Sequence, residues 1–297
     1  MSSLNRQNTP LFFLLAYLIS MPIYCLVQLA DQPSWVGPST ALTAASLFAF
    51  SLTYAIARHG LGRAIAMLMA SFAVALTLEY LGSSTGFLFG DYDYTDRLGP
   101  QLLGKVPAII PVAWFMMLYP AWATSDFLLT RVGARAAYGL LNAGMRITVA
   151  ALAMTAWDLS LDPRMVADGN WIWETAGPYF GIPLSNYLGW FVTAALIYII
   201  WHALIGAGTA QASSEDCAAL SFCRWPVWAY IITWLGESLA NAAFWGRPLV
   251  ALCVFLGMGL FGGPALVNLW RSAQRTSTHP LVQWLVASAV QLRQPRG

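Results

Sequence analysis

The sequence predicts an all-α, polytopic integral membrane protein of about eight transmembrane helices, forming a single transmembrane domain over residues 1–297. Of the 297 residues, 58% are hydrophobic and only 9% are charged, whereas an ordinary soluble domain carries about 25% charge. Trp occurs 14 times, and aromatic residues near segment ends are typical of the belts that anchor helices at membrane interfaces. The unbroken apolar runs of about 20 residues match helical spans, and they exclude a β-barrel, whose strands alternate over about 10 residues.

Taken in order, eight segments are close to the length that crosses about 30 Å of hydrocarbon. The spans are expected at residues 11–30, 39–57, 64–82, 107–129, 138–161, 186–206, 226–244 and 249–270. Basic residues concentrate in the loops on the side of the N-terminus, so the positive-inside rule predicts cytoplasmic N- and C-termini. The segment 207–225 is expected to be a cytoplasmic linker, and residues 281–292 a short surface helix.

Net charge and cysteine spacing exclude two classes of partner. The net charge is +2 and the basic residues are scattered, so no nucleic acid is expected to bind. Cys25 and Cys253 fall inside apolar spans and are interpreted as small core residues. Cys217 and Cys223 are too far apart for a CxxC motif and have no nearby His, so no metal site is predicted there.

Two polar stretches interrupt the apolar sequence, one from Glu79 to Pro120 and one from Trp157 to Asn186. The predicted topology places both on the outer side, and we expect them to face one another across a membrane site. The loop at 83–106 carries apolar residues between its glycines, which favours a re-entrant or interfacial segment over a solvated connection. Pro107 then lies near the first turn of the next span, where a missing N–H costs little.

Ionisable groups at membrane depth are costly and therefore candidates for function. The carboxylates in question are Glu79, Asp126, Asp158 and Glu237, and Arg146 is the one cation well inside a predicted span. Asp126 and Arg146 are interpreted as polar contacts that close the helix bundle, with each other among the partners. Glu237 fits a structural contact and a site member equally well.

Glu79 and Asp158 differ from the others because each adjoins a polar outer stretch. A carboxyl group held between Trp157, Trp114 and aliphatic side chains is expected to stay protonated near neutrality, because burial disfavours the charged form. Such an acid is able to protonate an unactivated alkene. Nearby aromatic rings would stabilise the resulting carbocation, although membrane-interface belts explain about half of such residues equally well. The aromatic candidates are Trp114, Phe115, Trp157, Trp171, Trp173 and Tyr179.

Two acidic patterns raise a different chemistry. Asp158 and Asp162 are four residues apart and share one helix face if the helix continues to Pro163. The sequence DYDYTD places Asp91, Asp93 and Asp96 on the outer loop. Paired acidic motifs hold Mg²⁺ on a diphosphate in membrane prenyltransferases, but the spacing here differs from their aspartate-rich helix and few cations lie on that side.

Two long blocks resemble the signature regions of the CruF-type carotenoid biosynthesis proteins. They are TGFLFGDYDYTDRLGPQLLGKVPAIIPVAWFMMLYPAW, at Thr85 to Trp122, and TAWDLSLDPRMVADGNWIWETAGPYFGIPLSNYLGW, at Thr155 to Trp190. The resemblance implies a membrane carotenoid hydratase that adds water across the terminal 1,2-type double bond of an acyclic end group, as in γ-carotene, lycopene or bisanhydrobacterioruberin. It implies a bacterial or archaeal cell membrane, a carotenoid substrate, the lipid bilayer and other carotenoid biosynthesis enzymes as partners, and no cofactor.

Within this interpretation the catalytic residues are expected to be Asp158 as proton donor, with Glu79 or Asp91 positioning the water. Which carboxylate donates the proton is left open. The residues expected to bind substrate are Trp114, Phe115, Trp157, Asp93, Tyr92, Asp162, Trp173, Tyr179 and Asn186. No metal ligands are predicted, since only His59, His202 and His279 are present, far apart in the sequence. The alternatives are another membrane isoprenoid enzyme, either a terpenoid cyclase or a Mg-dependent prenyltransferase, and a non-enzymatic carrier of an apolar ligand.

Overall fold

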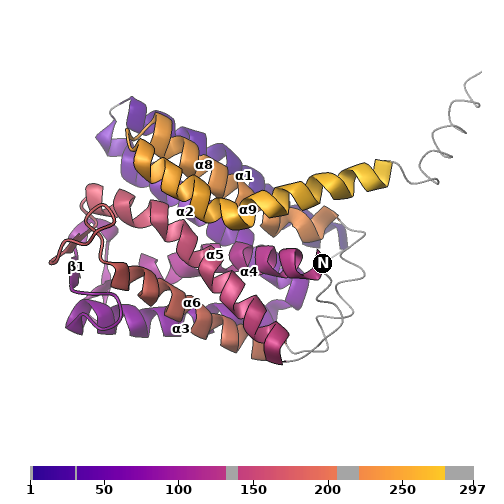
Figure 1. Ribbon diagram of the computed structural model, residues 1–297, viewed down its shortest axis with the longest axis horizontal. Coiled ribbons are helices and arrows are strands. Elements are labelled where there is room, and N and C mark those ends of the chain that lie inside the picture. The colour runs from indigo at the N-terminus through magenta and orange to yellow at the C-terminus, as the bar shows by residue number, and fades with distance from the viewer. Residues whose placement is uncertain (1–2, 31, 132–139, 206–220, 278–297) are drawn as a thin grey trace, which may run out of the picture.

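The computed structural model describes residues 3–30, 32–131, 140–205 and 221–277, and Figure 1 shows their arrangement as a bundle of long helices. The helices are α1 Ser3–Leu29, α2 Pro33–His59, α3 Leu61–Thr85, α4 Ile109–Arg131, α5 Leu140–Ala167, α6 Leu184–Ile205, α8 Trp225–Ala243 and α9 Pro248–Ser277. These eight helices confirm the predicted all-α membrane fold. Most of the expected linker at 207–225 and the expected surface helix at 281–292 lie outside the described residues.

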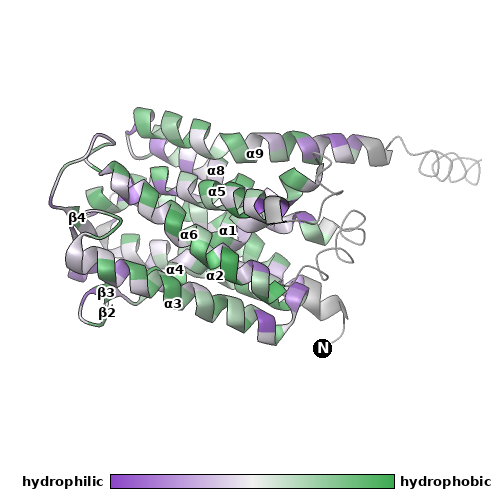
Figure 2. Ribbon diagram, turned by 60° about the horizontal axis from the view of Figure 1, so that its bottom comes forward, coloured by the Kyte–Doolittle hydropathy of each residue, from purple (hydrophilic) through white to green (hydrophobic). Residues whose placement is uncertain are grey.

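Five helices are long and apolar enough to cross a membrane by length and composition alone. They contain Asn8–Leu29, Ser34–His59, Leu61–Thr85, Leu184–Ile205 and Pro248–Gln274, in α1, α2, α3, α6 and α9. Hydrophobic residues cover most of the helix surfaces in Figure 2. The protein is therefore a membrane protein.

Helix α4 lies at the centre of the bundle and packs against α2, α3, α5, α8 and α9. Every residue from Trp114 to Trp122 is buried. Because neighbouring helices rather than lipid surround it, α4 can carry polar groups that a lipid-facing helix would not tolerate. Asp126 near its end pairs with Arg146 of α5 at 2.9 Å, which confirms that these two groups close the bundle together.

Two prolines inside helices explain two buried hydroxyl contacts. A proline in a helix leaves the carbonyl four residues earlier without its backbone donor. For Pro120 that carbonyl belongs to Met116, and the hydroxyl of Ser51 in α2 donates to it at 2.7 Å. For Pro163 it belongs to Leu159, and the hydroxyl of Tyr179 donates to it at 2.9 Å. Side chains thus replace the missing bonds, as membrane depth requires.

The two polar stretches meet at one end of the bundle. Between α3 and α4 the chain forms β1 Tyr92–Tyr94, a 3-10 turn at Asp96–Leu98, β2 Gln101–Leu102 and β3 Val106–Pro107, and β2 pairs with β3. Between α5 and α6 it forms β4 Trp171–Trp173, which pairs antiparallel with β1. The loop expected to be re-entrant or interfacial thus contains one short hairpin, β2–β3, and one strand, β1, that pairs with the second stretch. The stretches expected to face one another are hydrogen-bonded neighbours.

Candidate active site

A small, partly open cavity lies beneath the β1–β4 ribbon, between α3, α4, α5 and α6. Its volume is about 40 Å³, which is room for a few water molecules. Aromatic rings form most of its wall, and two carboxyl groups reach it from different helices. The lining residues are Glu79, Phe89, Tyr92, Tyr94, Ile110, Ala113, Trp114, Trp157, Leu161, Asp162, Trp171, Trp173, Asn186 and Trp190.

The ribbon supplies four of these residues because side chains alternate along a strand. Tyr92 and Tyr94 project from one face of β1, and Trp173 and Trp171 stand directly opposite them on β4. Asp93 and its partner Ile172 project from the other face and are exposed. The ribbon thus turns its aromatic face to the cavity and its exposed face away from it.

Glu79, near the end of α3, is buried and receives hydrogen bonds from three donors. Its Oε2 accepts from the hydroxyls of Tyr92 at 2.6 Å and Tyr94 at 2.7 Å, and its Oε1 accepts from the indole N–H of Trp114 at 3.0 Å. Burial, followed by the Glu79 carboxyl, raises the pKa of Tyr92 and of Tyr94 well above the ordinary tyrosine value. Both tyrosines therefore stay protonated and remain donors to Glu79 across the physiological range.

A second carboxyl group reaches the cavity from α5, supported by an amide and a further carboxyl. The Oδ1 of Asp162 accepts from the indole N–H groups of Trp171 at 2.7 Å and Trp173 at 3.2 Å. The Nδ2 of Asn186 donates both to Asp162 Oδ2 at 2.6 Å and to Asp158 Oδ2 at 2.7 Å. Helix α5 continues past Pro163 to Ala167, so the two aspartates do share one helix face.

Asp158 is fully buried, and its environment is poorer in donors than that of Asp162. Its Oδ1 has no hydrogen-bond partner among the described residues, while its Oδ2 receives only the Asn186 amide. Asp158 does not line the cavity. It lies one helical turn before Asp162, joined to it through Asn186.

Three tryptophans close the apolar side of the cavity. The rings of Trp114 and Trp190 stack with centroids 4.2 Å apart, and Trp157 meets Trp190 edge to face at 6.0 Å. Their π-faces would attract a positive charge formed in the cavity. The cavity therefore combines carboxyl groups with electron-rich walls.

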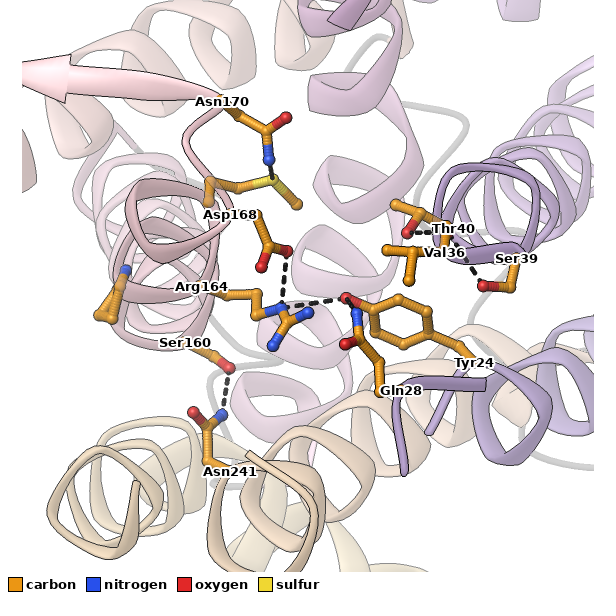
Figure 3. A network of polar contacts seen from close by, with 12 residues as sticks. Tyr24, Gln28, Val36, Ser39, Thr40, Ser160, Arg164, Asp168, Asn170 and Asn241 are labelled. Carbon is orange, nitrogen blue, oxygen red and sulfur yellow. Dashed lines mark hydrogen bonds and ion pairs between the residues drawn. The ribbon is translucent and has the colours of Figure 1, made fainter. Parts of the chain in front are cut away.

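The opposite face of α5 is fixed by a separate polar network, shown in Figure 3. Arg164 donates through Nε to the Tyr24 hydroxyl at 3.0 Å and pairs with Asp168 at 2.8 Å. Ser160 accepts from Asn241 at 2.8 Å. It also donates to Glu237 at 2.7 Å. These contacts hold α5 against α1 and α8, and so they fix the orientation from which the two aspartates project. Glu237 belongs to this network and does not line the cavity.

The predicted site residues divide into two groups. Those that line the cavity are Glu79, Tyr92, Trp114, Trp157, Asp162, Trp173 and Asn186. Those that do not line it are Asp158, Asp91, Asp93, Phe115 and Tyr179. Asp91 is exposed beside Gly86, Asp93 lies 3.8 Å from Lys105, and Phe115 packs on Phe48 and Trp201 in the core.

Six lining residues were not anticipated, and for two of them, Tyr94 and Trp190, the sequence carries a signal. Tyr94 lies two residues after Tyr92, and strand alternation would have placed both on one face. Trp190 lies four residues after Asn186 on α6, which places both on one face of that helix. Among the residues that the structure describes, no group of three His, Cys, Asp or Glu side chains is arranged to hold a metal ion.

Comparison with known proteins gives two matches. The family described as "Carotenoid biosynthesis protein" matches residues 36–261. A protein of Haloarcula japonica named bisanhydrobacterioruberin hydratase is 31% identical over 192 residues, which cover 63% of this chain and 61% of that protein. The match thus spans less than two thirds of the relative's length. No solved structure matches the chain.

Proposed function

The chain belongs to the carotenoid biosynthesis protein family, and from this premise we propose that it is a carotenoid hydratase. It adds water across the terminal 1,2-type double bond of an acyclic end group, of the γ-carotene, lycopene or bisanhydrobacterioruberin type, and gives a tertiary alcohol. The observation that carries the proposal is an aromatic cavity with carboxyl groups from α3 and α5 on its wall.

The proton comes from the aspartate pair on α5. Asp158 has a single donor and one unpartnered oxygen, so the neutral acid is the less costly form for this buried group. Two adjacent carboxyl groups also disfavour double ionisation, and a shared proton satisfies both. The proton rests on Asp158 and is delivered to the alkene by Asp162, which lines the cavity.

Proton transfer and water capture balance without any redox step. The O–H bond of the acid breaks as a C–H bond forms at the less substituted alkene carbon, and the positive charge then rests on the tertiary carbon. The tryptophan faces stabilise that charge. A cavity water forms the new C–O bond and loses one proton to Glu79, and this proton then returns through the remaining water to the aspartate pair.

Glu79 orients and deprotonates the attacking water. All three groups that contact its oxygens are donors, so the site is built to hold a hydrogen-bond acceptor. A water bound to this carboxyl would present its oxygen lone pairs to the cation and its hydrogen to Glu79. Asp91, the other residue considered for this role, is exposed outside the cavity.

The proposed enzyme works in a cell membrane with both termini in the cytoplasm and the cavity toward the outer side. The excess of basic residues on the side of the N-terminus supports this orientation. Labelling of single cysteines introduced at exposed positions near Lys105 and near Arg58, with a membrane-impermeant reagent in intact cells, tests it. Labelling near Arg58 alone would reverse the orientation.

The activity is tested in cells that accumulate lycopene. Cells that express the protein are expected to contain carotenoids heavier by one water for each modified end, measured by chromatography and mass spectrometry. Cells carrying an Asp162→Asn variant, with protein levels matched by immunoblot, serve as the control. An unchanged pigment profile with the wild-type protein correctly inserted in the membrane would refute the hydratase assignment.

A further inference from the structure

The cavity is large enough for a few waters but not for the long chain that follows a carotenoid end group. The chain must therefore leave through one of the walls. Central helix α4 and the stacked tryptophans close the inner side. The hydrogen-bonded β1–β4 ribbon closes the end of the bundle. The wall between α3 and α6 differs from the other helix contacts because, beside the cavity, a loop side chain fills the space between the two helices.

Helices α3 and α6 are joined at one end and wedged apart at the other. Far from the cavity, the indole N–H of Trp201 in α6 donates to Met67 O at 3.0 Å and to Ser71 Oγ at 3.1 Å, both in α3. Beside the cavity, each helix has a glycine, Gly82 in α3 and Gly189 in α6. The ring of Phe89 lies against both glycines.

The fit of the Phe89 ring leaves no space for a side chain at either glycine. A Cβ at Gly82 would lie 2.8 Å from the Phe89 ring, and a Cβ at Gly189 would overlap that ring. Phe89 is buried and also lines the cavity. The two glycines thus leave a slot between the helices beside the cavity, and a loop residue rather than a helix fills it.

The loop that carries Phe89 is held mainly by short-range bonds, from Phe89 N to Phe87 O and from Gly90 N to Gly86 O, and has an uncommon backbone conformation. Leu88 has φ of 72°, and Gly86 and Gly90 on either side also have positive φ. A leucine in this region is strained. The Ser185 hydroxyl of α6 donates to Phe89 O at 2.7 Å and ties the loop to α6.

We propose that the slot between Gly82 and Gly189 binds the polyene chain of the substrate, which enters from the bilayer when the Phe89 ring moves aside. The inference rests on the proposed hydratase function, because that function defines the ligand as a long apolar isoprenoid. The residue that precedes each glycine, Leu81 on α3 and Leu188 on α6, is exposed, so the outer mouth is apolar and suited to lipid. Hydration then takes place at the end of the chain that reaches the carboxyl groups.

The test compares two alkenes with the same trisubstituted terminus, lycopene and the short 2-methyl-2-heptene, on purified full-length protein in lipid nanodiscs. Phe89→Trp fills the slot more tightly. Because Phe89 also lines the cavity, the readout is the ratio between the substrates: we expect kcat/KM for lycopene to fall about tenfold more than that for the short alkene, which needs no slot. Phe87→Ala is the matched control, since Phe87 is exposed in the same loop. It should leave both substrates unchanged.

A second variant and a binding measurement separate this inference from the proposed function. Ser185→Ala removes the hydroxyl bond to the loop and should raise the association rate of lycopene, followed by quenching of tryptophan emission. If wild-type protein hydrates neither alkene but Phe89→Trp still weakens lycopene binding about tenfold, the function is wrong and the slot stands. Equal effects of Phe89→Trp on both alkenes, or unaltered lycopene binding in both variants, would overturn the slot.

Discussion

The sharpest prediction concerns the two aspartates of α5, replaced by asparagine singly and together. In Asp158→Asn, the new amide can keep its oxygen toward Asn186 and place its nitrogen where Oδ1 has no partner. Stability should therefore change little. In Asp162→Asn, the new amide nitrogen must face either the two indole N–H groups or the Asn186 amide, which are all donors. One buried bond is lost, at a cost of about 1–3 kcal/mol.

Activity should not follow this difference in stability. If the pair shares one proton, either substitution removes the acid, and each single variant should lose the contribution of general acid catalysis, about 10²–10⁴ in kcat. The double variant should be no slower than the slower single one, because residues that act as a unit are not additive. Loss of activity in the stable Asp158→Asn variant would separate chemistry from folding.

The assay measures hydrated product from lycopene by mass spectrometry, alongside thermal unfolding of the same detergent-solubilised preparations. Asp93→Asn is the matched control, because Asp93 projects from the exposed face of the same ribbon that lines the cavity. Full activity in Asp158→Asn would show that the proton does not rest there. Strictly additive losses in the double variant would show two independent roles and refute the shared proton.

Three further predictions follow from the same geometry. Trp190→Leu removes the stacking partner of Trp114 and should lower kcat about tenfold with little change in KM, because a cation face is needed only in the transition state; an effect on KM alone would contradict this. Tyr179→Phe leaves the Leu159 carbonyl without its donor and should lower the free energy of unfolding by about 1–3 kcal/mol. We expect a lower Tm with kcat unchanged in the folded fraction, and an unaltered Tm would show that this hydrogen bond does not stabilise the protein. Because the pKa of Tyr92 and of Tyr94 is raised in the folded protein, their contribution to stability is complete below about pH 10 and is lost as the pH rises further. A pH series of Tm with tyrosinate absorbance should show this decline in wild type and a weaker one in the Tyr92→Phe/Tyr94→Phe double variant, and identical profiles would refute it.

The helices were predictable from sequence because each long apolar run carries its own evidence of burial. All eight expected spans correspond to helices, including α4, α5 and α8, which fall outside the helices that are apolar enough to span alone. Local pattern also predicted that Asp158 and Asp162 share a face, since helical spacing fixes that relation. The pairing of Asp126 with Arg146 followed from the scarcity of partners at membrane depth.

The ribbon was not predictable in the same way, because its strands are three residues each and lie far apart in the chain. Neither YDY nor WIW is long enough to show a period that separates strand from loop. Once the pairing is known, alternation explains why Tyr92 and Tyr94 reach the cavity while Asp91 and Asp93 do not. The sequence DYDYTD shows three acidic residues, but it does not show which face of a strand each of them occupies.

The two carboxyl groups that line the cavity differ in what supports them, and this difference suggests how one chamber could separate acid from base. Glu79 is held by residues of the ribbon and of α4, and no second carboxyl group is bonded to it. Asp162 is tied through Asn186 to Asp158, and in the proposed mechanism this pair holds the acid proton. Asn186 is therefore the residue that distinguishes the two walls. If it were replaced by leucine, both aspartates would lose their common donor while Glu79 kept all three of its own. Proton donation by the aspartates should then be impaired, while binding of water at Glu79 is retained.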